Sequence, residues 1–144
     1  MRFEYMNVSE VRKINDFLEK RFGERLEQYY YLKQKDGVWV FSGGYEDFKN
    51  LRPGFVGFRL GTIGKKGDFR LSQEAAIIVK AKKNVLETSE EEARSWLAGK
   101  DLQKEGVDGW FLLKTRTGFF GAGKRVQGVF RNIVPKRSRV MAFF

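Results

Sequence analysis

The stretch WFLLKTRTGFFGAGKRVQGVFRNIV, residues 110–134, decides the fold. Its apolar runs predict three strands separated by glycine-containing turns, with a further strand near the end of the chain. The predicted strands are residues 110–114, 119–126, 129–134 and 140–144, and the turns are residues 115–118 and 127–128. Several short strands with such turns predict a small, curled, barrel-like sheet.

Upstream of this sheet, Ser89-x-x-Glu92 is a capping box, and Gly99 ends the helix that it predicts. Residues 77–79 form an apolar run too short to decide between strand and helix. Residues 55–61 predict a strand, and a loop-like segment of three glycines around Lys65-Lys66 follows it.

The first fifty residues have a different pattern. Apolar residues recur at helical spacing from Val11 to Phe22, with Ser9 available as N-cap and Gly23 as the stop. Residues 29–34 and 38–42 then predict a hairpin around Asp36-Gly37. This indicates a small α/β subdomain.

These patterns predict an α+β protein with two domains. A turn at residues 51–54 is the candidate boundary, so residues 1–50 form the N-terminal α/β subdomain and residues 51–144 form a mixed β-barrel with flanking helices.

Charge divides the chain at the same place. The sequence of 144 residues has 28 Lys+Arg against 18 Asp+Glu, a net charge of +10. Residues 1–50 contain 9 residues of each sign, so the excess lies in residues 51–144. Between residues 110 and 144 there are eight basic residues and no acidic one. An excess of one sign over such a stretch is typical of a surface that contacts phosphates.

Residue types that are missing exclude several functions. The chain has no Cys and no His, which excludes disulfides, thiolate nucleophiles, imidazole catalysis and the usual zinc ligands. No apolar window reaches the length of a membrane span or signal peptide, so we expect a cytoplasmic protein. We expect no metal or cofactor.

Residues 118–124 satisfy the pattern G-x-x-x-x-G-K of a phosphate-binding loop. Arg125 stands where that loop needs Ser or Thr for Mg²⁺, and no acidic metal partner follows, so we expect the glycines to bend a strand or admit a ligand backbone instead. The acidic cluster Glu90-Glu91-Glu92 lies in a first helical turn, where carboxylates stabilise the helix. We therefore expect no enzyme and no catalytic residues.

Basic residues interleaved with aromatics and glycines carry the functional prediction, because cations neutralise phosphates and aromatic faces stack on exposed bases. The predicted RNA-binding residues are Arg59, Lys65, Lys66, Arg70, Lys114, Lys124, Arg125, Arg131, Lys136, Arg137 and Arg139.

Several segments of residues 54–139 together resemble a known family. They are residues 54–61, 69–76, 92–102, 109–113, 118–124, 128–132 and 135–139. The family is the PUA-like domain at the C-terminal end of Sun/Fmu-type RNA cytosine-5 methyltransferases. Leu71 and Gln73 depart from it, since the family has Pro and often His at these positions. Residues 1–50 are similar in pattern to the subdomain that precedes PUA domains in some ribosome-biogenesis factors.

The resemblance implies an RNA-binding β-barrel, with Lys124, Arg131, Asn132, Lys136 and Arg139 near the RNA. It does not extend to a methyltransferase domain, and no cysteine is present to attack cytosine.

We therefore expect a non-catalytic protein that binds structured tRNA or rRNA, accessory to RNA modification or ribosome assembly. An RNA methyltransferase acting in trans is a candidate partner. The alternative is a protein-interaction module that docks on such an enzyme or on another acidic partner. An enzyme that uses carboxylates and lysines is a third and weaker hypothesis.

Overall fold

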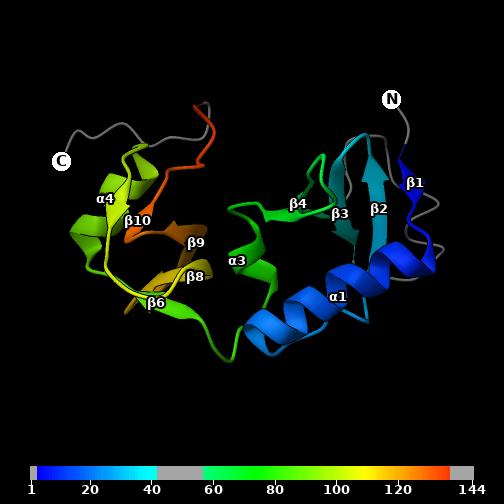
Figure 1. Ribbon diagram of the computed structural model, residues 1–144, viewed down its shortest axis with the longest axis horizontal. Coiled ribbons are helices and arrows are strands. Elements are labelled where there is room, and N and C mark those ends of the chain that lie inside the picture. Colours follow the sequence, from blue (N-terminus) through cyan, green and yellow to red (C-terminus); the bar gives the residue numbers. More distant parts are fainter. Residues whose placement is uncertain (1–2, 42–56, 137–144) are drawn as a thin grey trace.

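The computed structural model describes residues 3–41 and 57–136. Within them the chain forms two five-stranded sheets, with one long helix beside the first sheet and a short helix between the two (Figure 1). The α+β class predicted from the sequence is confirmed.

The first sheet is antiparallel throughout, in the order β1-β2-β3-β4-β5. Its strands are β1 (Glu4–Tyr5), β2 (Tyr30–Gln34), β3 (Gly37–Phe41), β4 (Phe58–Ile63) and β5 (Phe69–Leu71). The boundary predicted at residue 50 lies outside the described residues, so the division into two domains stays a prediction. The strands that flank it, β3 and β4, pair with each other.

Helix α1 (Val8–Phe22) begins two residues earlier than the predicted N-cap implies. Asn7, not Ser9, is the N-cap, and it forms a capping box with Glu10. Gly23 ends the helix in the left-handed conformation, with φ of 80°, as predicted. The hairpin after α1 is also confirmed, although Lys35 rather than Gly37 has the positive φ in its turn.

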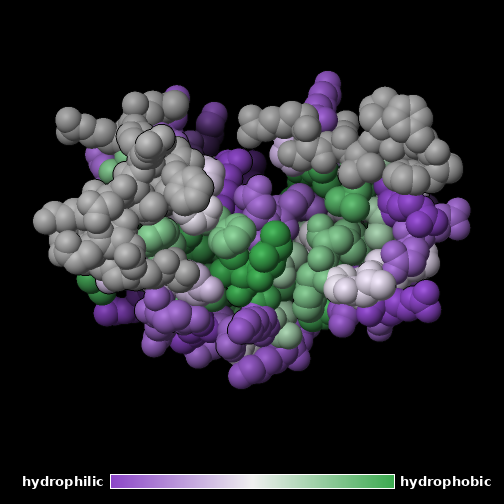
Figure 2. Space-filling view, turned by 180° about the vertical axis from the view of Figure 1, so that it is seen from behind, coloured by the Kyte–Doolittle hydropathy of each residue, from purple (hydrophilic) through white to green (hydrophobic). Residues whose placement is uncertain are grey.

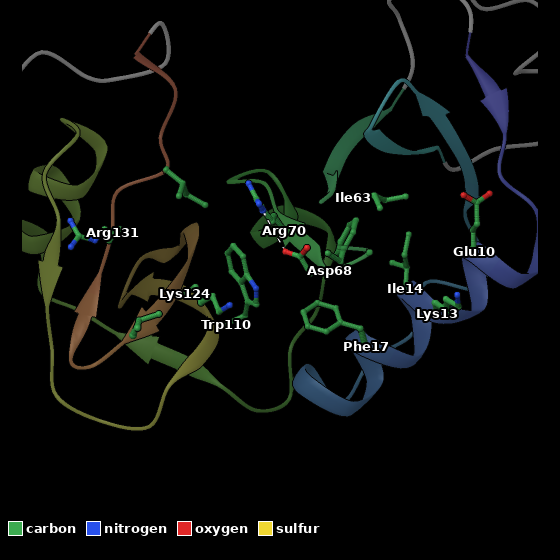
Figure 3. Close-up of a pocket in the computed structure, with 14 residues that line it drawn as sticks. Glu10, Lys13, Ile14, Phe17, Ile63, Asp68, Arg70, Trp110, Lys124 and Arg131 are labelled. Carbon is green, nitrogen blue, oxygen red and sulfur yellow. Dashed lines mark ion pairs between the residues drawn. The ribbon is translucent and has the colours of Figure 1, made fainter. Parts of the chain in front are cut away.

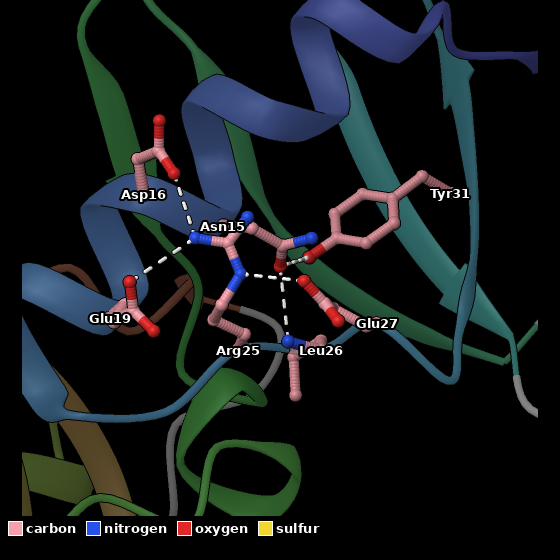
Figure 4. Close-up of polar contacts among 7 residues, drawn as sticks. All are labelled: Asn15, Asp16, Glu19, Arg25, Leu26, Glu27 and Tyr31. Carbon is pink, nitrogen blue, oxygen red and sulfur yellow. Dashed lines mark hydrogen bonds and ion pairs between the residues drawn. The ribbon is translucent and has the colours of Figure 1, made fainter.

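A polar cluster fixes the chain between α1 and β2 (Figure 4). The buried amide of Asn15 accepts hydrogen bonds from the Leu26 N–H at 3.0 Å and from the Tyr31 hydroxyl at 2.8 Å. Burial raises the pKa of that hydroxyl. Arg25 pairs with three acids outside this core: Asp16 at 2.7 Å, Glu19 at 3.4 Å and Glu27 at 2.8 Å. Arg25 thus partly offsets the negative charge of Asp16 and Glu19 on this side of α1.

The second sheet is mixed and curled, in the order β6-β8-β9-β10-β7, with β6 parallel to β8. Its strands are β6 (Val85–Glu87), β7 (Leu102–Gln103), β8 (Gly109–Thr115), β9 (Gly118–Val126) and β10 (Val129–Phe130). The last is shorter than predicted, and the strand predicted at residues 140–144 lies outside the described residues. Helix α4 (Glu90–Leu97) begins with the predicted capping box.

Helix α3 (Ala75–Ile78) includes the first two residues of the ambiguous run 77–79, and Val79 after it is extended. Gln73, just before it, ties this helix to the second sheet: its amide donates to the Ala122 carbonyl at 2.5 Å and accepts from the Trp96 indole at 2.7 Å. Gln73, which stands where the family often has His, therefore has a structural role in this chain.

The second sheet has two differently used faces, because successive strand residues point to opposite sides. One face carries Trp110, Leu112 and Ala122, which join a core shared with α1, α3 and the first sheet. We call it the groove face, because it borders the groove described below. On the opposite face, which we call the Trp96 face, Phe111, Leu113 and Phe130 pack with Trp96 in a second core.

The glycine-rich segment 118–124 forms most of β9 and is not a loop that opens a helix. This geometry does not fit a nucleotide-binding loop. Gly123 faces Trp96 and Phe130, and a Cβ there would lie 3.0 Å from the Phe130 ring and 3.2 Å from the indole. The glycines therefore let large rings pack directly on the strand, a packing role that the sequence analysis did not foresee.

Candidate nucleic-acid interface

A groove of about 740 Å³ lies between the two sheets (Figure 3). Residues from α1, from the β4–β5 region and from the groove face of the second sheet line it. They are Glu10, Lys13, Ile14, Phe17, Ile63, Gly67, Asp68, Phe69, Arg70, Trp110, Lys124, Val126, Arg131 and Ile133. The groove has the size of typical ligand pockets in proteins, about 300–1,000 Å³.

One wall comes from α1 and β5. Ile14 and Phe17 lie three residues apart on α1 and therefore share a helix face. The Phe17 ring makes an edge-to-face contact with Phe69, with ring centroids 6.1 Å apart. Both phenylalanines are only half-buried, which leaves aromatic surface open to the groove.

The other wall comes from β8 and β9. Trp110 and Lys124 are direct cross-strand partners, so their side chains lie on the same face of the sheet. Val126 continues that face two residues further along β9 and is 49% exposed, and Ile133 beyond β10 is 40% exposed. Seen from behind, hydrophobic residues also gather in the middle of the molecule, with hydrophilic residues around them (Figure 2).

The charges in the groove are unevenly placed. Glu10 and Lys13 lie at the α1 end, and Lys124 and Arg131 lie at the second-sheet end (Figure 3). Glu10 is 3.2 Å from the Lys33 ammonium, whose hydrogen bond lowers the pKa of this carboxyl.

The other acid, Asp68, lies 3.5 Å from Arg70. Lys124 and Arg131 pair with no acid in the described residues 3–41 and 57–136. The second-sheet end of the groove therefore carries uncompensated positive charge.

The groove brings together three of the twelve predicted RNA-binding residues, namely Arg70, Lys124 and Arg131. The others lie elsewhere. Lys65 and Lys66 are exposed in the β4–β5 turn, and Lys136 is exposed beyond Val134. Arg137 and Arg139 fall outside the described residues.

Two more predicted cations are held by neighbours on their own sheets. The Arg59 guanidinium donates to the Thr62 hydroxyl at 2.8 Å. The Lys114 ammonium lies 5.3 Å from the centre of the Phe119 ring.

Arg125 is a correction to the sequence prediction. It is 6% exposed and points into the Trp96 face, where its guanidinium lies over the Phe111 and Phe130 rings. It donates to the carbonyls of Val107, Lys104 and Glu105 at 2.9–3.2 Å. These contacts bury and satisfy Arg125, so it is a structural residue rather than a phosphate contact.

The Asn132 amide is likewise used within the fold. It donates to the carbonyls of Trp96 and Lys100 at 2.7 and 2.8 Å and accepts from the Val134 N–H at 2.9 Å. Asn132 therefore fastens the chain after β10 to the end of α4.

Residue-by-residue reading of the sequence missed the aromatic part of the groove. Two signals were available: the helical spacing of Ile14 and Phe17, and the alternation that puts Trp110 and Lys124 on one face.

The sequence analysis also did not single out Arg21. Its Nε donates to the Trp110 carbonyl at 2.6 Å, and its guanidinium lies 4.7 Å from the Phe111 ring. Burial and the nearby charge of Arg125 lower the pKa of Arg21.

Within the described part of the chain, no group of three or more His, Cys, Asp or Glu residues could hold a metal ion. In the same residues, no helix is long and apolar enough to cross a membrane.

The second sheet and its helix define the class of domain. Residues 83–140, which include β6 to β10 and α4, match the family model described as the methyltransferase RsmF PUA domain. The resemblance to a PUA-like domain of the Sun/Fmu type is thereby confirmed for residues 83–140.

A particular relative extends the match toward the N-terminus. The chain is 29% identical over 111 residues to the ribosomal RNA small subunit methyltransferase F of Vibrio atlanticus (strain LGP32). The alignment covers 74% of this chain and 23% of that protein, so the chain spans about a quarter of the length of this curated relative.

Proposed function

We propose that this protein is a non-catalytic RNA-binding protein that recognises structured tRNA or rRNA, in an accessory role in RNA modification or ribosome assembly. The observation that carries the proposal is the uncompensated charge of Lys124 and Arg131 at the edge of a groove with aromatic walls. Cations of this kind bind phosphates, and open aromatic surface stacks on bases. The PUA-domain match and the rRNA methyltransferase relative support an RNA ligand.

The exposed predicted residues extend the proposed contact surface beyond the groove. Lys65, Lys66 and Lys136 are free to reach phosphates further along a folded RNA. Arg137 and Arg139 stay predictions from the sequence.

The two-domain division at residue 50 also stays a proposal, together with the pre-PUA-like character of residues 1–50. Because the groove takes one wall from α1 and the other from the second sheet, this function requires both parts of the chain.

A binding assay tests the function. Fluorescence anisotropy would measure the affinity for total tRNA, an rRNA fragment and duplex DNA at several salt concentrations. The variant neutralises three groove cations: Lys13→Gln, Lys124→Gln and Arg131→Gln. The control neutralises three exposed lysines outside the groove: Lys20→Gln, Lys83→Gln and Lys100→Gln.

We expect a preference for the structured RNAs, and a fall of log affinity with log salt that is shallower by about two to three in the groove variant. The control changes net charge equally and should keep more of the affinity. Equal binding to every polyanion, or equal losses in both variants, would remove the proposal.

A second candidate function is that of a protein-interaction module that docks on a separately encoded RNA methyltransferase or another acidic partner; the relative supports it by its name, a ribosomal RNA methyltransferase. It predicts salt-tolerant binding to a protein and no RNA binding in the same assay.

A further inference from the structure

The groove combines two properties that one class of ligand shares. Its walls present half-buried aromatic and exposed aliphatic surface from Phe17, Phe69, Val126 and Ile133. Its second-sheet end presents the cations Lys124 and Arg131, which pair with no acid among residues 3–41 and 57–136. Exposed apolar surface gathered in a concave site indicates a binding partner that covers it.

The charge pattern gives that partner an orientation. Glu10 is held by Lys33 and by its capping box, and Asp68 lies beside Arg70, so neither acid compensates the second-sheet end. A ligand with a flat apolar part and an adjacent negative group would place the flat part against the half-buried rings of Phe17 and Phe69, and the charge at Lys124 beside the buried Trp110. Figure 3 shows the Phe17 and Trp110 side chains in the space between the sheets.

A nucleotide within an RNA strand has this form, provided that its base is unpaired. In a duplex the base faces are stacked and the Watson–Crick edges are occupied, so a base cannot enter a groove until it is splayed out. Backbone phosphates on each side of such a base lie at the groove edge, within reach of cations there.

We propose that the groove between the two sheets receives an unpaired base of a single-stranded or looped RNA segment, while Lys124 and Arg131 contact its flanking phosphates. This proposal rests on the RNA-binding function proposed above and deepens it: the protein reads unpaired nucleotides rather than helical RNA alone.

The test fills the groove without changing its charge. Val126→Trp places a large side chain at a half-exposed groove position, and Val107→Trp makes the same substitution at a residue that is 75% exposed and lies outside the groove. Ile133→Trp, at a groove position beyond β10, is the second groove-filling variant. Anisotropy would compare a single-stranded RNA with a blunt duplex of the same sequence and length, and thermal unfolding would confirm that each variant is folded.

We expect each groove-filling variant to weaken single-strand binding at least about tenfold, because base–aromatic stacking contributes roughly that much per base. Duplex binding should change less than about twofold, since surface phosphate contacts remain. Val107→Trp should alter neither.

Two results would overturn the proposal. If folded groove-filling variants bind both RNAs as the wild type does, the groove takes no base, and RNA binding survives as a function without it. If the wild type binds neither RNA, the proposed function fails as well, and a protein becomes the candidate occupant of the groove.

Discussion

The groove face and the Trp96 face of the second sheet are built from the same kinds of residue, yet only the Trp96 face is closed. Lys124 and Arg125 are neighbours in β9 and point to opposite sides. Arg125 is buried against two rings and bonded to three carbonyls. Lys124 is exposed beside Trp110 with no described acid as partner. A cation beside aromatic rings is therefore buried and hydrogen-bonded on one face, and on the other face it is exposed with no acidic partner among the described residues.

Backbone and helix packing explain the difference. Glycines at positions 121 and 123 let α4 approach the Trp96 face closely enough for the indole to be 1% exposed. On the groove face, Trp110 and Leu112 pack in a core with α1, α3 and the first sheet, whereas Val126 is 49% exposed. The exposed end of that face lines the groove.

Removing the central ring of the closed face should have the largest effect. Trp96→Ala deletes a fully buried side chain and its hydrogen bond to Gln73, so the free energy of unfolding should fall by about 3–5 kcal/mol. Urea unfolding measures this. Val107→Ala, at an exposed position, is the control and should change stability little. Equal effects from both would contradict the two-core description.

Arg125→Met tests whether Arg125 belongs to the fold. It leaves the carbonyls of Val107, Lys104 and Glu105 without their donor, so unfolding should become easier by about 2–3 kcal/mol. In conditions where the variant is folded, RNA affinity should match the wild type apart from the loss of one net charge. A stable variant with a large specific loss of RNA binding would return Arg125 to the RNA interface.

Lys124→Gln should show the reverse pattern. Stability should stay within about 0.5 kcal/mol, because the side chain is exposed and unpaired. RNA affinity should fall several-fold, with the slope of log affinity against log salt reduced by about one. Lys20→Gln is the matched exposed lysine on α1. Anisotropy titrations and urea melts on the same preparations separate the two effects.

The last prediction concerns the capping box at the start of α4. Ser89→Ala removes the cap of α4 and should lower stability by about 1 kcal/mol. The hydrogen bond from the Ser89 N–H, aided by Lys104, holds the pKa of Glu92 below its usual value.

Because the folded-state pKa is depressed, the stability contributed by Glu92 is present above the unfolded pKa of about 4.3 and is lost as pH falls through the folded value. Glu92→Gln should therefore flatten the loss of stability between neutral and acid pH. If the free energy of unfolding of Glu92→Gln, measured by urea unfolding, falls toward acid pH as steeply as that of the wild type, the pKa of Glu92 does not change on folding.

Local signals fixed most elements of this protein. The capping box at Ser89, the stop at Gly23 and the glycine turns around β9 each act within a few residues, so the sequence located α4, the end of α1 and the β8–β9–β10 meander. The start of α1 at Asn7 was missed because Asn and Ser are comparable N-caps. The pairing of β3 with β4 was missed because it links segments on opposite sides of an apparent boundary.

By itself, the sequence determined the α+β class and the surplus of positive charge, since composition and short-range spacing carry both. Its resemblance to a known family indicated the PUA-like domain that the family model matches at residues 83–140. Only the tertiary structure decided which cations are free. Arg125 and Lys124 have the same charge and adjacent positions, and strand alternation sends one into a core and the other to the groove. Likewise, Phe17 and Trp110 are 93 positions apart in the chain, and only the packing of α1 beside the second sheet makes them opposite walls of one site.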